Sequence, residues 1–201
     1  INHLTLRGEE VWIAADAGLF CSLADGSVQK VALPPVSTDS IRSIASLSGQ
    51  IWVGTSSEGL WLLDKSQWVS GASLGCFARA IYRIQTTPSG LLAVATGDAG
   101  LFLKRSAAAS FEHWDRAKGL PSDIVNCLFE DREQNLWIGT DIGGVARLGT
   151  NSVANYGMQQ GLPHACVFGI SPGSVEDSLW LGTLRGAVHL HSAVFGGDGD
   201  V

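Results

Sequence analysis

Residues 119–148 alternate short apolar runs with polar turns, and this pattern predicts three antiparallel strands. The apolar runs cover 124–129, 136–140 and 145–148, and they are separated by a polar turn and by a turn that contains glycine. Turns of both kinds are typical of hairpins. The middle run is apolar at successive positions rather than alternate ones, which predicts that protein covers both faces of its sheet. A single three-stranded unit cannot supply that cover.

The same pattern recurs along the chain. A tryptophan in the middle run marks four copies, at Trp12, Trp52, Trp137 and Trp180, and Ala93 takes its place in a fifth copy. Neighbouring markers lie about 40 to 44 residues apart. An apolar run precedes each marker, starting at Ile1, Ile41, Ile81, Ile124 and Val167. Repeats of this length predict an all-β fold, a β-propeller of four-stranded antiparallel blades.

The repeats divide the chain into five expected blades and a tail. The blades span approximately 1–36, 37–76, 77–119, 120–161 and 162–192, and residues 193–201 form a tail or a short closing strand. Propellers have roughly 4 to 8 blades, so the five blades form either a closed ring or a segment of a larger propeller. We favour the segment because the chain starts on an inner strand and leaves little sequence for the last outer strand. A segment has two uncovered blade faces, which we expect to self-associate.

Residues 105–118 contain three consecutive alanines, which favour a helix. The repeat predicts a strand instead. Phe111 and Trp114 are followed by Gly-Leu-Pro at 119–121, and Val153 and Tyr156 are followed by Gly-Leu-Pro at 161–163. We therefore expect an outer strand at both places, each leading into the next blade.

Composition agrees with a folded all-β chain and argues against two classes of partner. The chain has 201 residues, of which 45% are hydrophobic and 16% charged, with 25 glycines. Its formal charge is −6 and its 13 Lys and Arg residues are scattered, so we expect no nucleic-acid partner. No run approaches the roughly 20 apolar residues of a membrane span. The chain starts at Ile1 without a signal peptide, and we expect it to be a piece of a longer protein.

Four cysteines, Cys21, Cys76, Cys127 and Cys166, lack the C-x-x-C spacing of a metal cluster. Neighbouring blades would bring Cys127 close to Cys166, which allows a disulfide, but buried free thiols are the favoured interpretation. We expect no cofactor and no metal.

Three further motifs suggest chemistry that their context does not support. Ser73 lies in a G-x-S-x-G sequence, which acts as a nucleophile elbow only between a strand and a helix, and no helix is expected after it. His189 and His191 face one side of a strand, but no third metal ligand accompanies them, so we expect exposed edge histidines. Residues 196–200 resemble one fragment of a calcium-binding repeat and are expected to be tail. The sequence therefore predicts no catalytic residue.

The fourth copy carries a family resemblance. Gly-Leu-Pro at 119–121, the Glu130-Asp131 pair, Asn-Leu-Trp-Ile-Gly-Thr at 135–140 and Gly143-Gly144 resemble the two-component regulator propeller repeat. The match is good in the second and fifth copies and weaker in the first and third. Gln134 stands where Gly49 and Gly90 stand in other copies, so we expect a different turn there. The resemblance implies a periplasmic or extracytoplasmic sensor region, commonly ahead of a bacterial histidine kinase or diguanylate cyclase.

The motif itself has a packing explanation. A marker tryptophan buries about 150–250 Å², and the glycine two residues later permits close backbone approach. We therefore assign a structural role to seven residues: Trp12, Trp52, Trp137, Trp180, Gly54, Gly139 and Gly182.

Two functional classes follow. The first is a non-catalytic module that binds a small-molecule or glycan ligand, or other propeller domains of the same protein. The alternative is a propeller enzyme, a lyase or hydrolase acting on glycans with side chains at one channel mouth, whose paired carboxylates would come from different blades. In the turns between second and third strands each blade carries one charged residue, and two interpretations are open. The favoured one is that each is an independently solvated turn residue, since Asp is a good turn former. The sharper hypothesis, for the first class, is that together they form a charged rim at which the ligand binds. These rim residues are Asp16, Glu58, Asp98, Asp141 and Arg185.

Overall fold

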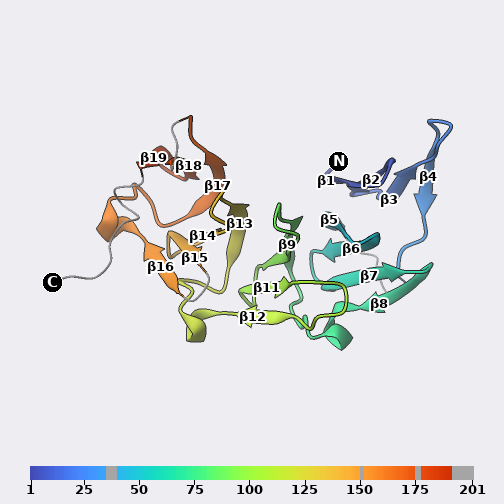
Figure 1. The fold of residues 1–201 in the computed structure, drawn as a ribbon, viewed down its shortest axis with the longest axis horizontal. Helices are drawn as coiled ribbons and strands as arrows, with labels where there is room; N and C mark the ends of the chain where they lie inside the picture. The colour runs from blue at the N-terminus through green and yellow to red at the C-terminus, as the bar shows by residue number, and fades with distance from the viewer. Residues whose placement is uncertain (35–39, 150–151, 175–177, 192–201) are drawn as a thin grey trace.

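The computed structural model describes residues 1–34, 40–149, 152–174 and 178–191. Within this part of the chain there are five separate sheets, four with four strands and one with three. The sheets follow one another along an arc, and the first strand of each lies on the inner side of the arc while the last lies on the outer side (Figure 1). The prediction of consecutive antiparallel propeller blades is therefore confirmed.

In every blade each strand pairs with the next one along the chain, and all pairs are antiparallel. Three short 3₁₀ helices lie in the links between blades: η1 (Gly71–Leu74), η2 (Arg116–Lys118) and η3 (Met158–Gln160). The strands, in chain order, are β1 (His3–Arg7), β2 (Glu10–Ala15), β3 (Gly18–Ser22), β4 (Val28–Val31), β5 (Ile41–Leu47), β6 (Gln50–Thr55), β7 (Leu60–Asp64), β8 (Gln67–Ser70), β9 (Ile81–Thr86), β10 (Leu92–Thr96), β11 (Leu101–Lys104), β12 (Glu112–Trp114), β13 (Val125–Glu130), β14 (Leu136–Thr140), β15 (Val145–Leu148), β16 (Val153–Tyr156), β17 (Val167–Pro172), β18 (Ser178–Thr183) and β19 (Gly186–His191).

The links that carry Gly-Leu-Pro were predicted as outer strand followed by turn, and this is confirmed. β12 and β16 pair with the third strands of their blades. The sequence did not predict the single 3₁₀ turn that follows each of them. Asp115 caps the first of these turns by accepting a hydrogen bond from the Lys118 N–H, and Gly119 ends it at a φ of 99°. A positive φ of this size favours glycine, which explains the first letter of Gly-Leu-Pro.

The turn before β14 differs from expectation. Gln134 was expected to give it a different form from the turns at Gly49 and Gly90. Its φ is 63°, in the same left-handed region as the two glycines at 79° and 87°. The side chain of Asp131 accepts a hydrogen bond from the backbone N–H of Asn135 at 2.8 Å and holds the turn closed, so a non-glycine residue is tolerated there.

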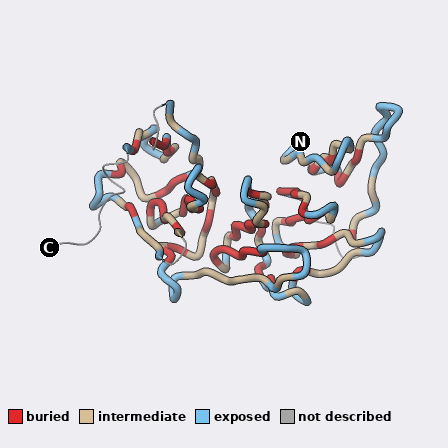
Figure 2. The backbone as a smooth tube through the Cα atoms, viewed as in Figure 1, coloured by how far each residue is buried: buried red, intermediate tan, exposed pale blue. Residues whose placement is uncertain are grey.

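Burial along the second strands shows where the arc ends. In the three interior blades, every residue of β10 and β14 is buried, and so is every residue of β6 after Gln50. In the two end blades, β2 buries Trp12 and Ala14 and leaves the alternate residues half-buried. β18 leaves Trp180 exposed and Gly182 and Thr183 half-buried. Figure 2 colours the backbone by burial. One face of each end blade is therefore uncovered in the described chain. The five sheets do not close into a ring, as Figure 1 also shows.

Four of the five marker residues are buried, and one prediction is wrong. Trp12, Trp52, Ala93 and Trp137 are at most 3% exposed, whereas Trp180 is 44% exposed. Each buried marker faces the next blade along the arc, and within the described residues no blade follows the fifth. Trp180 instead stacks on His189, with ring centroids 4.5 Å apart. The tail predicted at 193–201 lies outside the described residues.

The marker glycines repeat this contrast. A Cβ built on Gly54 would stand 2.4 Å from Cγ2 of Ile81, and one on Gly139 would stand 3.0 Å from Cγ1 of Val167. Ile81 and Val167 begin the inner strands of the following blades. At Gly182 the nearest atom would be 3.8 Å away. The packing role assigned to the glycine therefore applies where a following blade is present.

Candidate binding surface at the rim and inner wall

The five predicted rim residues all lie in the turns between second and third strands. Asp16 and Arg185 lie in the end blades, and Glu58, Asp98 and Asp141 lie in the interior ones. The three interior acids occupy different places in their turns. The strands β14, β10 and β6 all end in a threonine, and the rim acid follows it by one residue in the case of Asp141, two for Asp98 and three for Glu58. The rim charges therefore differ in how they are presented, although they share one edge of the blades.

Three of the rim acids also hold the links between blades. Asp16 accepts a hydrogen bond from Nδ2 of Asn2 at 2.9 Å, and the same amide donates to the Ile41 carbonyl of the second blade at 2.7 Å. Asp98 accepts from the backbone N–H of Arg79 at 3.0 Å. Asp141 accepts from the Cys166 thiol at 3.1 Å. At each of these positions a carboxylate connects a rim turn to the chain that enters an inner strand.

Glu58 differs from the other rim acids. Its residue is half-buried, and its Oε2 is buried with no hydrogen-bond partner among the described residues. A buried carboxylate oxygen without a partner costs free energy. Glu58 is therefore the rim acid whose hydrogen-bonding capacity is least used within the described chain.

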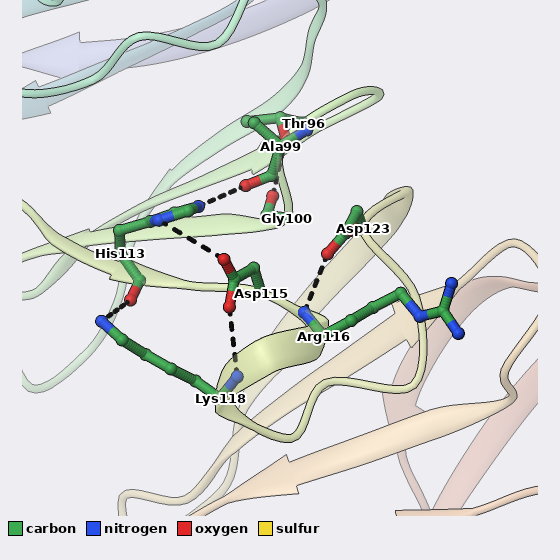
Figure 3. A network of polar contacts seen from close by, with 8 residues as sticks. All are labelled: Thr96, Ala99, Gly100, His113, Asp115, Arg116, Lys118 and Asp123. Atoms are coloured by element: carbon green, nitrogen blue, oxygen red, sulfur yellow. Dashed lines mark hydrogen bonds and ion pairs between the residues drawn. The ribbon is translucent and has the colours of Figure 1, made fainter.

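The link from the third blade into the fourth shows how firmly the rim is built (Figure 3). Nε2 of His113 lies 2.7 Å from the Ala99 carbonyl in the rim turn, and the Asp123 side chain accepts from the Arg116 N–H at 2.8 Å. The backbone N–H of Gly100 donates to the Asp123 carbonyl at 2.7 Å. The rim turn, the outer strand and the link are thus held as one unit, which suits a surface that must keep its shape on binding.

The first strands of the blades, β1, β5, β9, β13 and β17, line the inner side of the arc and are called the inner wall here. Side chains near the rim-side ends of these strands join one blade to the next. His3 accepts a hydrogen bond through Nδ1 from the Ile44 N–H at 3.1 Å, and Nδ1 lies 3.0 Å from the Ser43 hydroxyl. Ser43 in turn accepts from the Ile84 N–H at 2.8 Å. Burial lowers the pKa of His3, and the positive charge of Arg83 lowers it further. The neutral imidazole is therefore favoured, which agrees with its role as an acceptor.

A β-bulge occurs at the second residue of the inner strand in four consecutive blades. In each case the register shifts by one residue between the first and third positions of the strand. Bulges re-aim a side chain and are over-represented beside active sites. The bulged residues are Arg42, Tyr82, Asn126 and Phe168.

Sequence reasoning did not single out the inner-wall residues. Arg42, Tyr82 and Phe168 are exposed, whereas Asn126 is half-buried and donates to the Val167 carbonyl at 3.2 Å. The sequence did contain a signal for these residues. In three inner strands a charged or aromatic residue directly follows the buried apolar residue with which the strand begins. It was missed because one extra residue in a strand reverses the alternation on which face assignments depend.

Hollows at the edges of the blades include two that are lined by described residues. One, of about 370 Å³, is at the rim beside Asp141 and is lined by Ile142, Met158 and Ala165 among others. The other, of about 640 Å³, lies between the first two blades at their opposite edge, and its lining includes Trp12 and Trp68. The first of these places exposed apolar side chains next to a predicted rim residue.

The motifs that suggested chemistry do not assemble catalytic geometry. Ser73 lies within η1, where its hydroxyl donates to the Ser70 carbonyl at 2.7 Å, so it is not presented by a strand-to-helix elbow. His191 is exposed as expected, but His189 is half-buried. No group of three or more His, Cys, Asp or Glu side chains within the described ranges could hold a metal ion.

The cysteines are free thiols, as the favoured interpretation had it. Cys127 and Cys166 lie at the junction of the fourth and fifth blades, where the Cys127 thiol points to the Val167 carbonyl at 3.8 Å. Burial raises the pKa of Cys127 to about 12 and that of Cys166 to about 11. Neither thiol is poised as a nucleophile.

The helices in the described ranges are three short 3₁₀ turns, and none of them is long and apolar enough to cross a bilayer. The strand order and the packing between sheets define the class of the protein: an open run of β-propeller blades. Residues 119–141 match the family model described as "Two component regulator propeller". Residues 119–141 therefore carry the two-component regulator propeller repeat, as the resemblance predicted.

Solved structures with this fold include extracellular parts of bacterial regulators. The chain is similar to the extracellular domain of a hybrid two-component system from B. thetaiotaomicron, with 21% identity and a TM-score of 0.76, over 98% of this chain and 29% of that one. It is also similar to the extracellular domain of a one-component system from the same organism, with 20% identity and a TM-score of 0.69, over 95% and 27%.

An enzyme shares the fold as well. Virginiamycin B lyase from Staphylococcus aureus matches with 16% identity and a TM-score of 0.69, over 94% of this chain and 69% of that one. Likeness at this level of identity shows the fold alone. The chain spans less than a third of the length of the two regulator domains. No curated protein matches the sequence.

Proposed function

We propose that this chain is a non-catalytic sensor module, which binds a ligand or partner as the extracytoplasmic part of a bacterial two-component or cyclic-dinucleotide signalling protein. The observation that carries the proposal is the regulator propeller repeat at residues 119–141. The extracellular regulator domains that share the fold support the same role and location.

The ligand site proposed for this module is the rim. Asp16, Glu58, Asp98 and Asp141 place carboxylates along one edge of four consecutive blades, and Arg185 continues the edge in the fifth. Fields of neighbouring charges add at a concave edge, and carboxylates accept hydrogen bonds from hydroxyl and ammonium groups. We therefore propose a cationic or polyhydroxylated ligand, such as a glycan, or another propeller domain of the same protein.

A binding screen with matched variants tests the rim. Candidate glycans and peptides are titrated into the wild type and into the double variant Asp98→Asn/Asp141→Asn. The control is Glu133→Gln, because Glu133 is exposed in the turn at the opposite edge, between β13 and β14. We expect the rim variant to weaken binding and the control to leave it unchanged. A ligand whose affinity depends on Glu133 and not on the rim would overturn the proposed location.

The glycan-cleaving alternative is tested with the same protein. Each glycan that binds is incubated with the chain, and the products are followed by chromatography. A sensor module is expected to release the glycan intact. Release of a shortened or unsaturated product, lost on neutralising the rim carboxylates, would favour the propeller enzyme.

A further inference from the structure

We propose that Arg42, Tyr82 and Arg83 form a site on the inner wall for an anionic group carried on a ring, such as the carboxylate of a sugar acid. The inference rests on the ligand-binding function proposed above and names a chemical class for the ligand. It places the charged part of that ligand below the rim, on residues that the rim hypothesis does not include.

The bulge in β9 presents two consecutive side chains to solvent. The strand begins with buried Ile81, and its fourth residue, Ile84, is also buried, whereas Tyr82 and Arg83 between them are exposed. The register shift occurs between Ala95 and Thr96 of β10, which pair with Arg83 and Ile81. In a regular strand, successive side chains point to opposite faces, so one of these two residues would point towards a neighbouring blade. The bulge keeps both on the open wall.

The ring of Tyr82 packs against a glycine of the rim turn, and the other interior blades have no glycine at that position. It lies against the rim turn, where a Cβ on Gly97 would stand 2.5 Å from its Cζ and 2.8 Å from its hydroxyl oxygen. The residue that follows the same threonine is Ser56 in the second blade and Asp141 in the fourth. Glycine therefore occurs where the bulged residue is a tyrosine. The ring is held by the turn, and 39% of the residue stays exposed.

Arg42 comes to the same place from the neighbouring blade. Its guanidinium carbon lies 5.9 Å from the centroid of the Tyr82 ring, within the range of a cation–π contact. Among the described residues, neither Arg42 nor Arg83 has a carboxylate within ion-pair distance, whereas Arg7 and Arg105 each pair with a glutamate at 2.7 Å. The donors of Arg42 are thus left available beside the exposed ring of Tyr82. Arg83, the next residue along β9, is exposed as well.

The remaining charges of the inner strands do not compete for this role. In the described part of β1, β5, β9, β13 and β17, the other charged residues are Arg7 and Glu130. Both stand at the far ends of their strands, where Arg7 pairs with Glu10 and Glu130 accepts from the Ser89 N–H at 2.8 Å. Among the charged residues of the inner strands themselves, those in the rim-side half are therefore the two arginines, Arg42 and Arg83.

Guanidinium groups favour a planar carboxylate or a sulfate, which they can bind with two parallel hydrogen bonds. The exposed part of Tyr82 offers apolar contact to the ring that carries the anion. A bare inorganic anion would use the arginines alone. An anion carried on a ring and a bare inorganic anion would therefore both bind to the arginines, and only the first would also contact Tyr82.

The test uses ¹⁵N-labelled chain and a pair of probes that differ in one group, methyl β-glucuronide and methyl β-glucoside, with inorganic sulfate as the bare anion. Amide shifts are followed during titration of the wild type, Arg42→Gln, Arg83→Gln and Tyr82→Leu. The control is Arg116→Gln, because Arg116 lies on the outer side and extends away from its network (Figure 3). Arg83→Lys keeps the positive charge but cannot form the two parallel hydrogen bonds of a guanidinium group. Thermal unfolding at an unchanged temperature confirms that each variant is folded.

We expect the glucuronide to shift the amides of Tyr82 and Arg83 in a saturable way, and each arginine variant to weaken its binding about tenfold. Arg83→Lys should fall between, and Arg116→Gln should match the wild type. Sulfate shifts that survive Tyr82→Leu would support a bare-anion site on the same arginines. Equal binding of the glucoside, shifts elsewhere, or no shift with either anion would overturn the inference. A glycan that binds through the rim carboxylates alone would leave the proposed function standing without this site.

Discussion

Gly54 lies directly against Ile81 of the next blade, so closely that a single added methyl would stand 2.4 Å from Cγ2 of the isoleucine. The same position in the fifth blade, Gly182, has its nearest atom at 3.8 Å. Gly54→Ala should therefore destabilise the chain by about 1–3 kcal/mol through overpacking. Gly182→Ala should be neutral or slightly stabilising, because alanine loses less entropy in a strand. Urea unfolding of both variants measures the difference, and equal losses would mean that the glycine is needed for something other than blade packing.

Trp137 and Trp180 occupy equivalent positions with different burial, at 2% and 44% exposed. Trp137→Ala should cost about 3–5 kcal/mol, as for other large-to-small core changes. Trp180→Ala should cost less, because it loses mainly the stacking on His189, which is worth about 0.5–1.5 kcal/mol. Chemical denaturation measures both changes. Acrylamide quenching gives an independent check, since removing Trp180 should lower the accessible fluorescence more than removing Trp137.

His3 should make stability depend on pH. Its pKa is lowered from 6.5 in the folded chain, first by burial and then by Arg83. Below pH 6.5 the unfolded chain therefore binds more protons than the folded one, so the free energy of unfolding falls as pH drops from 6.5 towards the lowered pKa, and is unaffected by this group above 6.5. His3→Gln should flatten that part of the profile. Titration of the imidazole by NMR should also show a higher pKa in Arg83→Gln, and an unchanged value would mean that Arg83 does not face His3.

Ser73 should be chemically inert. Its hydroxyl is engaged by the Ser70 carbonyl within a 3₁₀ turn, and no general base is placed beside it among the described residues. A serine-reactive phosphonate should fail to label the chain. Stoichiometric labelling that disappears in Ser73→Ala would contradict this.

The sequence predicted the blades because their packing leaves a local trace. Trp137 and the apolar run around it show that both faces of β14 are covered, and this holds in the structure. The prediction of burial failed at Trp180. The motif indicates that the strand can pack against a following blade, whereas the burial of Trp180 depends on whether such a blade is present. Gln134 was misjudged for a related reason: the hydrogen bond from the Asn135 N–H to the Asp131 side chain supports a left-handed residue that residue type alone disfavours.

The sequence predicted less of the candidate binding site than of the fold. The rim acids could be placed because the turns are fixed by the strand order, but their partners, such as the Arg79 N–H at Asp98, come from other segments. Arg42 and Tyr82 meet only because bulges in two neighbouring blades aim them at each other. A bulge shifts the register by one residue and so breaks the alternation, which means that periodicity alone does not find it.

The central structural claim is that the described residues of these five blades form an open arc with an uncovered face at each end. Sedimentation velocity over a range of concentrations tests it most directly. The account predicts concentration-dependent association, because exposed apolar faces and sheet surfaces seek partners, and it predicts that Trp180→Glu on the fifth blade weakens that association. A stable monomer whose sedimentation is independent of concentration and unaffected by Trp180→Glu would contradict the open arc.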